Sequence, residues 1–595
     1  MLTSTKGKVL YALISCCLII GFSNCSSSSG PSAPGVVDDV TQKSGYFVDA
    51  TNGNDSNAGN SAAAPWKSLA KVSGATFNSG TTIYLKKDEV WREQLNIPSS
   101  GVTIDAYGSG GALPLIDGSI EVKDWVAEGG GIYSQQVNLD ANEALGNVSE
   151  NGVILNFLPW KSTSDATFAS AIFGTFSFEY SQKKLFIKVS ANPTGKSYLA
   201  SRKLYGVSAI GKSDILIQNI KITRFSLNGV NFQNCQNCSV KNATISDGGG
   251  VVLASNPSGT PSYIYGGNGI EYDTNSSGGI VDGVAISGIF DSGISPQTYA
   301  NNETSSGITF QNSTIDTSGF AGVEISILSN GGKTGSQIKD VRMTGLTITN
   351  SGKGWSGRRY GTEGHGVRIQ ADAGAGTMSG IVLQASTIDG SAGVGVKLVG
   401  EVGAVTLSRL KVSNNNVGIE ALDPVGQSLR LDLSTSLIFN NTGGGIVFNA
   451  PKAGGLSVQQ NTLTNNPPIN FSVYNQAGRA KIQNNIFYSS ATLTHVYVAS
   501  PLTGEVAFNN NCYNEMVNMI GYGGAAHSTV LSFRGATGFE NQGLGGQVNF
   551  VNPATADFRL QAGSQCRGLG DPSIGISLDY SGVSFSSPPP SGAME

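Results

Sequence analysis

One short pattern, glycine followed by apolar, variable and apolar residues, recurs in Gly269-Ile-Glu-Tyr-Asp273, Gly293-Ile-Ser-Pro-Gln297, Gly322-Val-Glu-Ile-Ser326, Gly366-Val-Arg-Ile-Gln370 and Gly395-Val-Lys-Leu-Val399. Side chains alternate between the two faces of a strand, so the apolar residues face one way and the residue between them faces the other. Stacked as neighbouring strands, the segments present an outward column of Glu271, Ser295, Glu324, Arg368 and Lys397. A second outward column, two residues on, consists of Asp273, Gln297, Ser326, Gln370 and Val399. The pattern predicts one strip that carries carboxylates and cations.

A longer repeat surrounds these segments. Ile215-Leu-Ile-Gln-Asn-Ile-Lys-Ile-Thr223, Ile308-Thr-Phe-Gln-Asn-Ser-Thr-Ile-Asp316 and Leu456-Ser-Val-Gln-Gln-Asn-Thr-Leu-Thr464 are variants of one strand, turn and strand unit. The regular units return at roughly 24-residue spacing, as in stacked solenoid repeats. We expect three strands per coil with Ile, Val, Leu and Phe inside. Asparagine recurs in the turn, where its amide can hydrogen-bond to the same residue one coil away: Asn219, Asn312, Asn461 and Asn485.

The composition agrees with short strands and tight turns. The chain has 80 glycines and only 13% charged residues, a balance that favours strands and turns over helices. A net charge of -4 provides no basic field, so no nucleic-acid partner is expected. Cys235-Gln-Asn-Cys238 has the spacing of a zinc or redox half-site, but no second pair completes it. We expect inward-facing thiols or a local stack there.

The first 25 residues have the features of a secretion signal. Lys6 and Lys8 precede an apolar run from Val9 to Phe22, the arrangement of a signal peptide. Cys25, followed by four serines, resembles the lipidated cysteine of bacterial lipoprotein signals; an ordinary signal peptide is the alternative. No later stretch is apolar and long enough to span a membrane. We therefore expect export to the periplasm, the cell exterior, or the outer membrane or cell surface, with membrane attachment through a lipid anchor only.

The remaining chain divides by its patterns. Pro65-Trp-Lys-Ser-Leu-Ala-Lys-Val72 reads as a short helix, with proline near its start. This opening resembles that of right-handed parallel β-helix proteins of the pectate lyase superfamily, in which a helix caps the open end of the stacked sheets. The resemblance implies an all-β chain folded as a right-handed parallel β-helix. The sequence patterns divide it into a linker 26–45, cap and first coils 46–119, an inserted antiparallel β module 120–205, the β-helix 206–570 and a tail 571–595. Ser584 to Glu595, rich in Pro and Ser, is expected to be disordered.

Insertions locate the predicted site. The coils between Asp247 and Gly380 carry long turns on both sides of the outward columns, and long loops around a rigid scaffold are where binding is usually built. These loops would form the walls of a groove that binds a polysaccharide. We expect the protein to be a monomer. The candidate substrate-binding residues are Asp247, Asp291, Gln297, Gln370, Trp355 and Tyr360.

The first functional hypothesis is cleavage of an acidic polysaccharide by β-elimination. In the pectate lyase superfamily this strand column forms the sugar-binding cleft, with acidic residues that bind calcium and an Arg or Lys as base. Glu271, Asp273 and Glu324 could accordingly hold Ca²⁺, which prefers oxygen ligands. Arg368 or Lys397 would then be the base or a substrate clamp, and the clamp is the better role for an arginine.

The second hypothesis is glycoside hydrolysis. Glu271 and Glu324 lie two rungs apart, about 10 Å at the backbone, which approaches the separation of acid and base in inverting glycosidases. Glu363-Gly-His365-Gly366 resembles the Gly-His-Gly of polygalacturonase-type hydrolases, so His365 is a further candidate. A third hypothesis is a non-catalytic glycan-binding or adhesin-like surface protein. Glu324 beside Arg368 could also be a simple cross-rung ion pair on a polar surface.

Overall fold

The structure is a computed structural model that describes residues 43–158, 166–179, 182–255, 263–329, 331–355, 363–423, 429–450, 454–476 and 478–595. The predicted signal peptide, with Cys25, and the linker up to residue 42 lie outside the described residues. Tyr360 also lies outside them. Among the described residues, no helix is long and apolar enough to cross a membrane.

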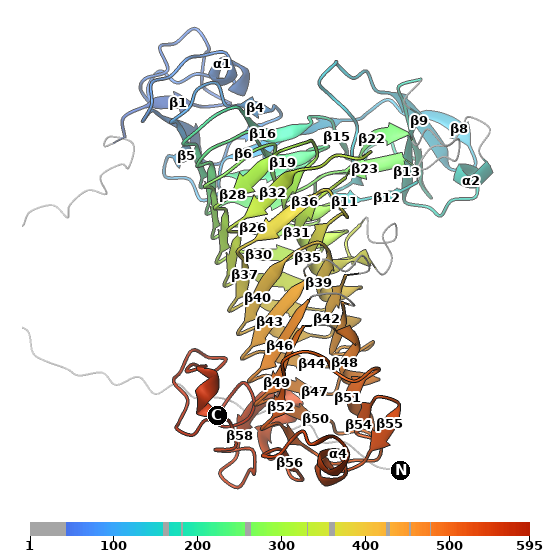
Figure 1. Ribbon diagram of the computed structural model, residues 1–595. Helices are drawn as coiled ribbons and strands as arrows, with labels where there is room; N and C mark the ends of the chain where they lie inside the picture. Colours follow the sequence, from blue (N-terminus) through green and yellow to red (C-terminus); the bar gives the residue numbers. More distant parts are fainter. Residues whose placement is uncertain are drawn as a thin grey trace, which may run out of the picture.

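Three sheets, each of 14 strands, form a single column of stacked coils (Figure 1). One sheet runs from β1 (Tyr46–Val48) to β52 (Val506–Asn509), and another from β3 (Val90–Trp91) to β56 (Leu544–Gly545). The third, here called the groove sheet, contains in spatial order β4 (Leu95–Asn96), β16 (Tyr205–Ile210), β19 (Asn228–Gln233), β24 (Ile270–Asp273), β27 (Ser292–Thr298), β31 (Ala321–Ile327), β35 (His365–Ala371), β39 (Val394–Gly400), β42 (Val417–Leu422), β45 (Ile446–Ala450), β48 (Ile469–Gln476), β51 (Thr494–Val498), β54 (Ile520–Tyr522) and β55 (Ala525–His527). Only its last pair, β54 with β55, is antiparallel. The predicted right-handed parallel β-helix is confirmed.

The register of the groove sheet confirms both outward columns. Glu271 lies opposite Ser295 and Glu324 lies opposite Arg368. Arg368 in turn lies opposite Lys397. The alternate residues face the core: the inward side chains of β24, β31 and β35 are fully buried, namely Ile270, Tyr272, Val323, Ile325, Val367 and Ile369. The glycine-led segments therefore fix which side chains reach the surface.

The core is one continuous apolar cluster through the column. Identical residues stack in it. Ile222, Ile245, Ile286, Ile315 and Ile348 are paired in register from coil to coil and are at most 2% exposed. Complete burial of such a side chain contributes about 1.5–3 kcal/mol. The stack holds the coils in register, and this register in turn aligns the polar residues of the groove sheet.

The asparagine ladder exists in the C-terminal coils. The Asn461 amide donates to Asn485 Oδ1 at 3.1 Å, and Asn485 donates to Asn511 at 2.9 Å. Asn219 and Asn312 do not fit this prediction. Both have positive φ and donate instead to aspartates of the preceding coil, Asp105 and Asp282. They occupy the left-handed position of the turn, one residue before the inward-facing ladder position.

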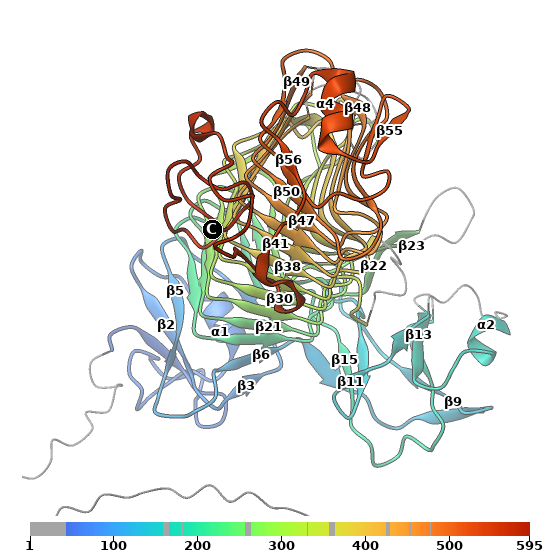
Figure 2. The same cartoon turned by 90° about the horizontal axis from the view of Figure 1, so that it is seen from below.

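The inserted module forms two small sheets. One contains β8 (Val126–Gly129), β9 (Ile132–Gln136), β12 (Asn156–Phe157), β13 (Thr175–Glu179) and β14 (Lys184–Lys188), and the other contains β7 (Ser119–Glu121), β10 (Val148–Glu150), β11 (Val153–Ile154) and β15 (Tyr198–Ser201). All their pairs are antiparallel except β12 with β13. A separate apolar cluster fills the module. Figures 1 and 2 show it beside the N-terminal end of the column, across from the cap.

The cap helix is shorter than its sequence pattern predicts. α1 spans Leu69–Ser73, and the Ser68 side chain accepts a hydrogen bond from the Lys71 amide. Residues 65–68 are held differently, because Asp55 accepts from the amides of Lys67 and Ser68 at 2.8 and 3.0 Å. These hydrogen bonds of Asp55 and the Ser68 cap make the helix begin at Leu69 instead of near Pro65.

The structure contains two disulfides among the described residues. Cys235 is bonded to Cys238, and Cys512 is bonded to Cys566. All four residues are fully buried. The inward direction expected for Cys235 and Cys238 is correct, but their sulfur atoms are joined.

The C-terminal residues are ordered on the column, contrary to the predicted disorder. Ser591 and Ala593 are fully buried, and the Gly592 amide donates to Asn484 O at 2.7 Å. The Ala593 amide donates to Thr462 Oγ1 at 3.0 Å. Composition alone favours disorder in a Pro- and Ser-rich segment. Here small side chains let the backbone approach the turns of earlier coils closely enough to hydrogen-bond with them.

Candidate functional site

A pocket of about 410 Å³ opens on the groove sheet. It is lined by Tyr205, Leu227, Asn228, Asn231, Gln233, Gly266, Gly267, Asn268, Glu271, Asp273, Asp291, Gln297, Tyr299, Phe320, Glu324 and Leu328. Five of the predicted site residues are thus brought together: Glu271, Asp273, Asp291, Gln297 and Glu324. The lining contains four carboxyl groups and no Lys, Arg or His.

Glu271 is buried between two polar side chains. It is 3% exposed. The Asn268 amide nitrogen donates to its Oε2, and Tyr299 Oη lies 3.1 Å from its Oε1. The Asn268 amide is oriented by the backbone, because its Oδ1 accepts from the Ser292 amide at 2.9 Å. The orientation of the Asn268 amide is therefore fixed, and its nitrogen stays directed at Glu271 Oε2.

Glu324 has a different environment. It is 7% exposed. Ser292 Oγ and Ser326 Oγ each donate to it at 2.9 Å. The Gln297 amide nitrogen donates to the same Oε2 as Ser292, at 3.2 Å. Three donors aimed at one carboxyl group stabilise its ionised form.

Gln297 and Tyr299 connect the two carboxyl groups. Since the Gln297 nitrogen faces Glu324, its Oε1 faces Tyr299 Oη, which it contacts. Tyr299 Oη also donates to Glu271 Oε1, at 3.1 Å. The phenol has one proton for these two acceptors, so Glu271 has one full donor, Asn268, and one shared donor, whereas Glu324 has three donors. The network therefore stabilises the ionised form of Glu324 more than that of Glu271.

The electrostatics agree with this difference. Burial, with the negative charge of Asp273, raises the pKa of Glu271 well above its usual value. Burial also raises the pKa of Glu324, but the Ser326 and Ser292 hydroxyls and the charge of Arg368 oppose this rise. Burial and the charge of Glu271 raise the pKa of Tyr299, which therefore stays a neutral phenol. The pKa is thus raised for both glutamates, and the rise is larger for Glu271 than for Glu324.

The predicted calcium ligands do not fit a calcium site. Glu271 and Glu324 direct their oxygens at protein donors, and burial raises the pKa of Asp273 as well. A calcium ion needs six to eight oxygen ligands, largely ionised or carbonyl oxygens. Among the described residues, no three His, Cys, Asp or Glu side chains are grouped so that they could hold a metal ion.

The predicted cations form a separate cluster further along the groove sheet. Glu363 Oε2 lies 3.1 Å from Arg368 Nη1, 3.1 Å from His365 Nε2 and 3.9 Å from Lys397 Nζ. Arg368 also lies over the Phe320 ring, 4.9 Å from its centroid. None of these three cationic or imidazole side chains lines the pocket. Phe320 lines the pocket and also packs against Arg368 and His365, so the basic cluster adjoins the pocket at this ring.

His365 has a structural environment. It is 1% exposed, and its Nδ1 accepts a hydrogen bond from the Val394 amide at 3.1 Å. Burial, with the charges of Lys397 and Arg368, lowers its pKa to about 3. The imidazole is therefore neutral and its Nδ1 is occupied, so it connects β35 to β39.

Three other predicted binding residues lie outside the pocket. Asp247 has positive φ in the turn after β21 (Thr244–Ser246). Trp355 donates to Gly288 O at 2.9 Å and its ring packs on Phe290. Gln370 accepts from Arg368 Nε at 2.8 Å and donates to Asp372 at 2.7 Å. These residues support turns and the basic cluster.

Several lining residues were missed in the sequence. Tyr299 carried a readable signal, since it continues the outward alternation of Ser295 and Gln297. Asn268 directly precedes the glycine of its segment, but nothing in the pattern indicates its bond to Glu271. Tyr205 comes from β16 of an earlier coil, so only the stacking of the coils places it beside the glutamates; Phe320 directly precedes β31, the strand of Glu324.

Comparison with known proteins agrees with the architecture. The family model for a right handed beta helix region matches residues 196–354 and 356–487. A solved structure described as XylC in complex with xylose is 13% identical, with a TM-score of 0.56 over 92% of this chain and 98% of that chain. Pectate lyase Pel9A is 15% identical, with a TM-score of 0.36 over 94% and 98%. A GH136 lacto-N-biosidase from Eubacterium ramulus is 13% identical, with a TM-score of 0.37 over 78% and 68%.

None of the curated proteins matches the sequence. The matched region lies within the stacked coils, and the three parallel sheets are continuous through it. The chain is a right-handed parallel β-helix protein.

Proposed function

We propose that this chain is a carbohydrate-active enzyme that cleaves a glycan by glycoside hydrolysis, with Glu271 as general acid and Glu324 as general base. The observation that supports this most is the hydrogen-bond network through Gln297 and Tyr299, which gives Glu271 only a share of the phenol proton and presents three donors to Glu324. Two carboxyl groups whose surroundings push their pKa values apart are the pair that this reaction needs.

The roles follow from this difference in pKa. Glu271 donates its proton to the glycosidic oxygen as the bond to the anomeric carbon breaks. Glu324 accepts a proton from a water molecule, whose oxygen attacks that carbon. The strands of the two residues are two rungs apart, about 10 Å at the backbone, which leaves room for the water. This spacing supports inversion rather than retention of the anomeric configuration.

β-Elimination on an acidic glycan is the second candidate. One observation favours it: Arg368 lies directly opposite Glu324 in the register of the groove sheet. The chemistry needs a cation at the substrate carboxylate. Arg368 is instead turned to Glu363 and Gln370, and the pocket lining carries no basic side chain. Hydrolysis therefore has more support.

The experiment is an incubation of residues 26–595 with a panel of neutral and acidic polysaccharides, with and without EDTA. Reducing ends, ultraviolet absorbance and the anomer formed first are recorded. New reducing ends of inverted configuration, without absorbance and unaffected by EDTA, are expected. Absorbance that EDTA abolishes would replace hydrolysis with calcium-dependent elimination. Binding without either product would make the chain a glycan-binding or adhesin-like protein.

We further propose that the protein is exported and held at a membrane by lipid on Cys25. The signal-like first 25 residues support this, as do the two disulfides, since such bonds persist in oxidising compartments. Incorporation of a labelled fatty acid into the full chain, and its loss in Cys25→Ser, is the test. Incorporation that survives in Cys25→Ser would refute this anchor.

A further inference from the structure

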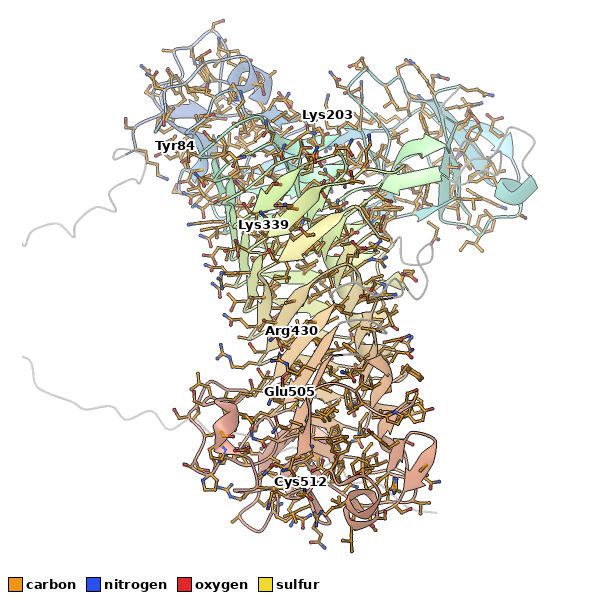
Figure 3. All side chains as sticks on the ribbon, viewed as in Figure 1. Tyr84, Lys203, Lys339, Arg430, Glu505 and Cys512 are labelled. Carbon is orange, nitrogen blue, oxygen red and sulfur yellow. A yellow bond between two sulfur atoms is a disulfide. The ribbon has the colours of Figure 1, made fainter. Side chains whose placement is uncertain are left out.

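A second cavity lies next to the pocket, at the N-terminal end of the groove sheet. Its volume is about 650 Å³. One wall is the cap, with Ala70 and Ser73 of α1; the other is the inserted module, with Asp140 to Glu143. Its floor includes Gln94 and Asn96, at the edge of the groove sheet. Figure 3 labels Lys203, which also lines this cavity, in the region between the two lobes.

The two cavities are direct neighbours. The Tyr205 amide donates to Gln94 Oε1 at 3.0 Å. Tyr205 lines the pocket that contains the glutamates, and Gln94 lines the second cavity. One hydrogen-bonded contact therefore separates the two spaces.

The outward column of Glu271 continues into the second cavity. Glu271 lies opposite Asn231, Asn231 opposite Ser208, and Ser208 opposite Asn96. All three added residues are neutral and polar. Asn231 lines the pocket and Asn96 lines the second cavity. Ser208 between them is 4% exposed and lines neither, so a bound chain would pass over this rung beside Tyr205. Three rungs separate Glu271 from Asn96, roughly 14 Å at the strand spacing of a sheet. A single sugar residue cannot bridge this distance, but an oligosaccharide laid along the column can.

The polar wall of the module is held in place by ion pairs. Glu143 Oε1 lies 2.5 Å from Lys203 Nζ, and its other oxygen contacts Arg202 Nε. These two ion pairs hold the loop from Asp140 to Glu143 against the β-helix. It also pairs Lys203, the one basic residue in the lining of the second cavity. The path from Glu271 to Asn96 therefore offers amides, hydroxyls and carboxyl groups, with no unpaired cation in either lining.

We propose that the substrate is an uncharged polysaccharide whose chain extends from the Glu271 and Glu324 pocket into the cavity between the cap and the inserted module. This rests on the proposed glycan-binding role of the pocket. The inserted module then recognises chain length, since only an oligosaccharide that passes Tyr205 reaches its wall. A uronate polymer is disfavoured, because its carboxylates would meet the carboxyl groups of both cavities.

The test uses two matched tryptophan variants of the full chain. Ala141→Trp fills the second cavity from the module side, and Ala127→Trp places the same side chain on β8. Both alanines are exposed, and only Ala141 lines the cavity. The probes are neutral xylo-, gluco- and galacto-oligosaccharides of increasing length, with oligogalacturonates of equal length as the charged counterparts.

We expect Ala141→Trp to lower kcat/KM for long neutral oligosaccharides by roughly ten-fold and to leave that for the shortest cleaved substrate unchanged. Ala127→Trp should match the wild type at every length. Equal effects of Ala141→Trp at all lengths, or none, would overturn the inference while hydrolysis stands. So would preferential cleavage of the oligogalacturonates.

Binding separates this inference from the proposed reaction. If no oligosaccharide is cleaved, the proposed hydrolysis fails, and calorimetry with the same probes decides the inference. Length-dependent binding of neutral probes that Ala141→Trp weakens would support it. Binding that this variant leaves unchanged, or no binding, would overturn it.

Discussion

Tyr299 Oη lies 3.1 Å from Glu271 Oε1, and this contact distinguishes two glutamates that look equivalent in the sequence. The phenol has one proton and two acceptors, Gln297 Oε1 and Glu271 Oε1. Glu271 therefore receives only a shared proton from Tyr299, in addition to the hydrogen bond from Asn268. Glu324, at the other end of Gln297, accepts from three donors. The side chains of Gln297 and Tyr299, both uncharged, thus determine which glutamate is proposed as the acid and which as the base.

The first prediction concerns these two glutamates. Glu271→Gln and Glu324→Gln should each lower kcat by about 10²- to 10⁴-fold, the usual contribution of a general acid or base. Glutamine keeps the size of the side chain and most of its hydrogen bonds. Initial rates of reducing-end release measure the effect. Glu420→Gln, in the same outward column but outside the pocket, is the control and should retain activity; equal losses in all three variants would point to altered folding instead.

The second prediction is a bell-shaped dependence of kcat/KM on pH. Activity needs ionised Glu324, so it is lost as the pH falls through the pKa of that group. It also needs protonated Glu271, so it is lost as the pH rises through the strongly raised pKa of Glu271. The residual activity of Glu271→Gln should lack the alkaline limb, because no titrating acid remains. An alkaline limb that persists in this variant would assign the acid to another residue.

The third prediction concerns Arg368. Its charge lowers the pKa of Glu324, so Arg368→Gln lets that pKa rise. The acid limb of the pH profile should therefore move to higher pH, while the alkaline limb set by Glu271 stays. Arg342→Gln, at the exposed first residue of β33 (Arg342–Thr344), is the matched control. An unmoved acid limb in Arg368→Gln would show that Arg368 does not act on the base.

The fold could be predicted from the sequence because its determinants are local and repeated. The glycine-led segments fix the strand register, and Ile222, Ile245 and Ile286 recur at the same position of successive coils. It was harder to tell from the sequence which asparagines occupy the left-handed position of the turn and which belong to the asparagine ladder. Asn219 and Asn461 lie one position apart in the turn, and both positions accept asparagine, so residue type alone does not tell them apart.

The site was predictable only along the strands. Outward alternation identified Glu271, Asp273, Gln297 and Glu324, which all line the pocket. It also joined Arg368 to them, because alternation alone does not show that the Arg368 side chain turns to Glu363 and Gln370 instead of into the pocket. The same limit applies to protonation. Both glutamates lie between two apolar residues of a glycine-led segment and next to Ser295 in the column, and the difference in their pKa depends largely on hydrogen bonds between separate coils.

A fourth prediction concerns Glu540, which ends the asparagine ladder. It is fully buried and accepts from Asn511 and Tyr513, both at 2.7 Å. Burial raises its pKa to about 7. Because the folded pKa exceeds the unfolded one, the stability this group provides is complete below pH 4.5 and is lost as the pH rises to about 7, by about 3 kcal/mol.

Glu540→Gln should remove most of that pH dependence. Unfolding midpoints measured from pH 4 to pH 8 should fall less with pH in this variant than in the wild type, and Glu505→Gln, at a mostly exposed position, should follow the wild type. Parallel curves for the wild type and Glu540→Gln would mean that Glu540 is ionised in the folded protein at the lower end of this range.

The last prediction tests the ordered C-terminal segment. Gly592 has φ of 99°, and a Cβ placed on it would lie 2.5 Å from Ile486 Cδ1. Gly592→Ala should therefore destabilise the protein by about 1–3 kcal/mol, the usual cost of a residue forced into such a conformation. Gly563 has open space at its Cβ and no positive φ, so Gly563→Ala is the control and should leave the thermal midpoint close to that of the wild type. A disordered tail would tolerate both changes equally, because an unpacked glycine adopts any conformation. A lower thermal midpoint in Gly592→Ala alone would show that the segment packs on Ile486 and contributes to the stability of the C-terminal coils.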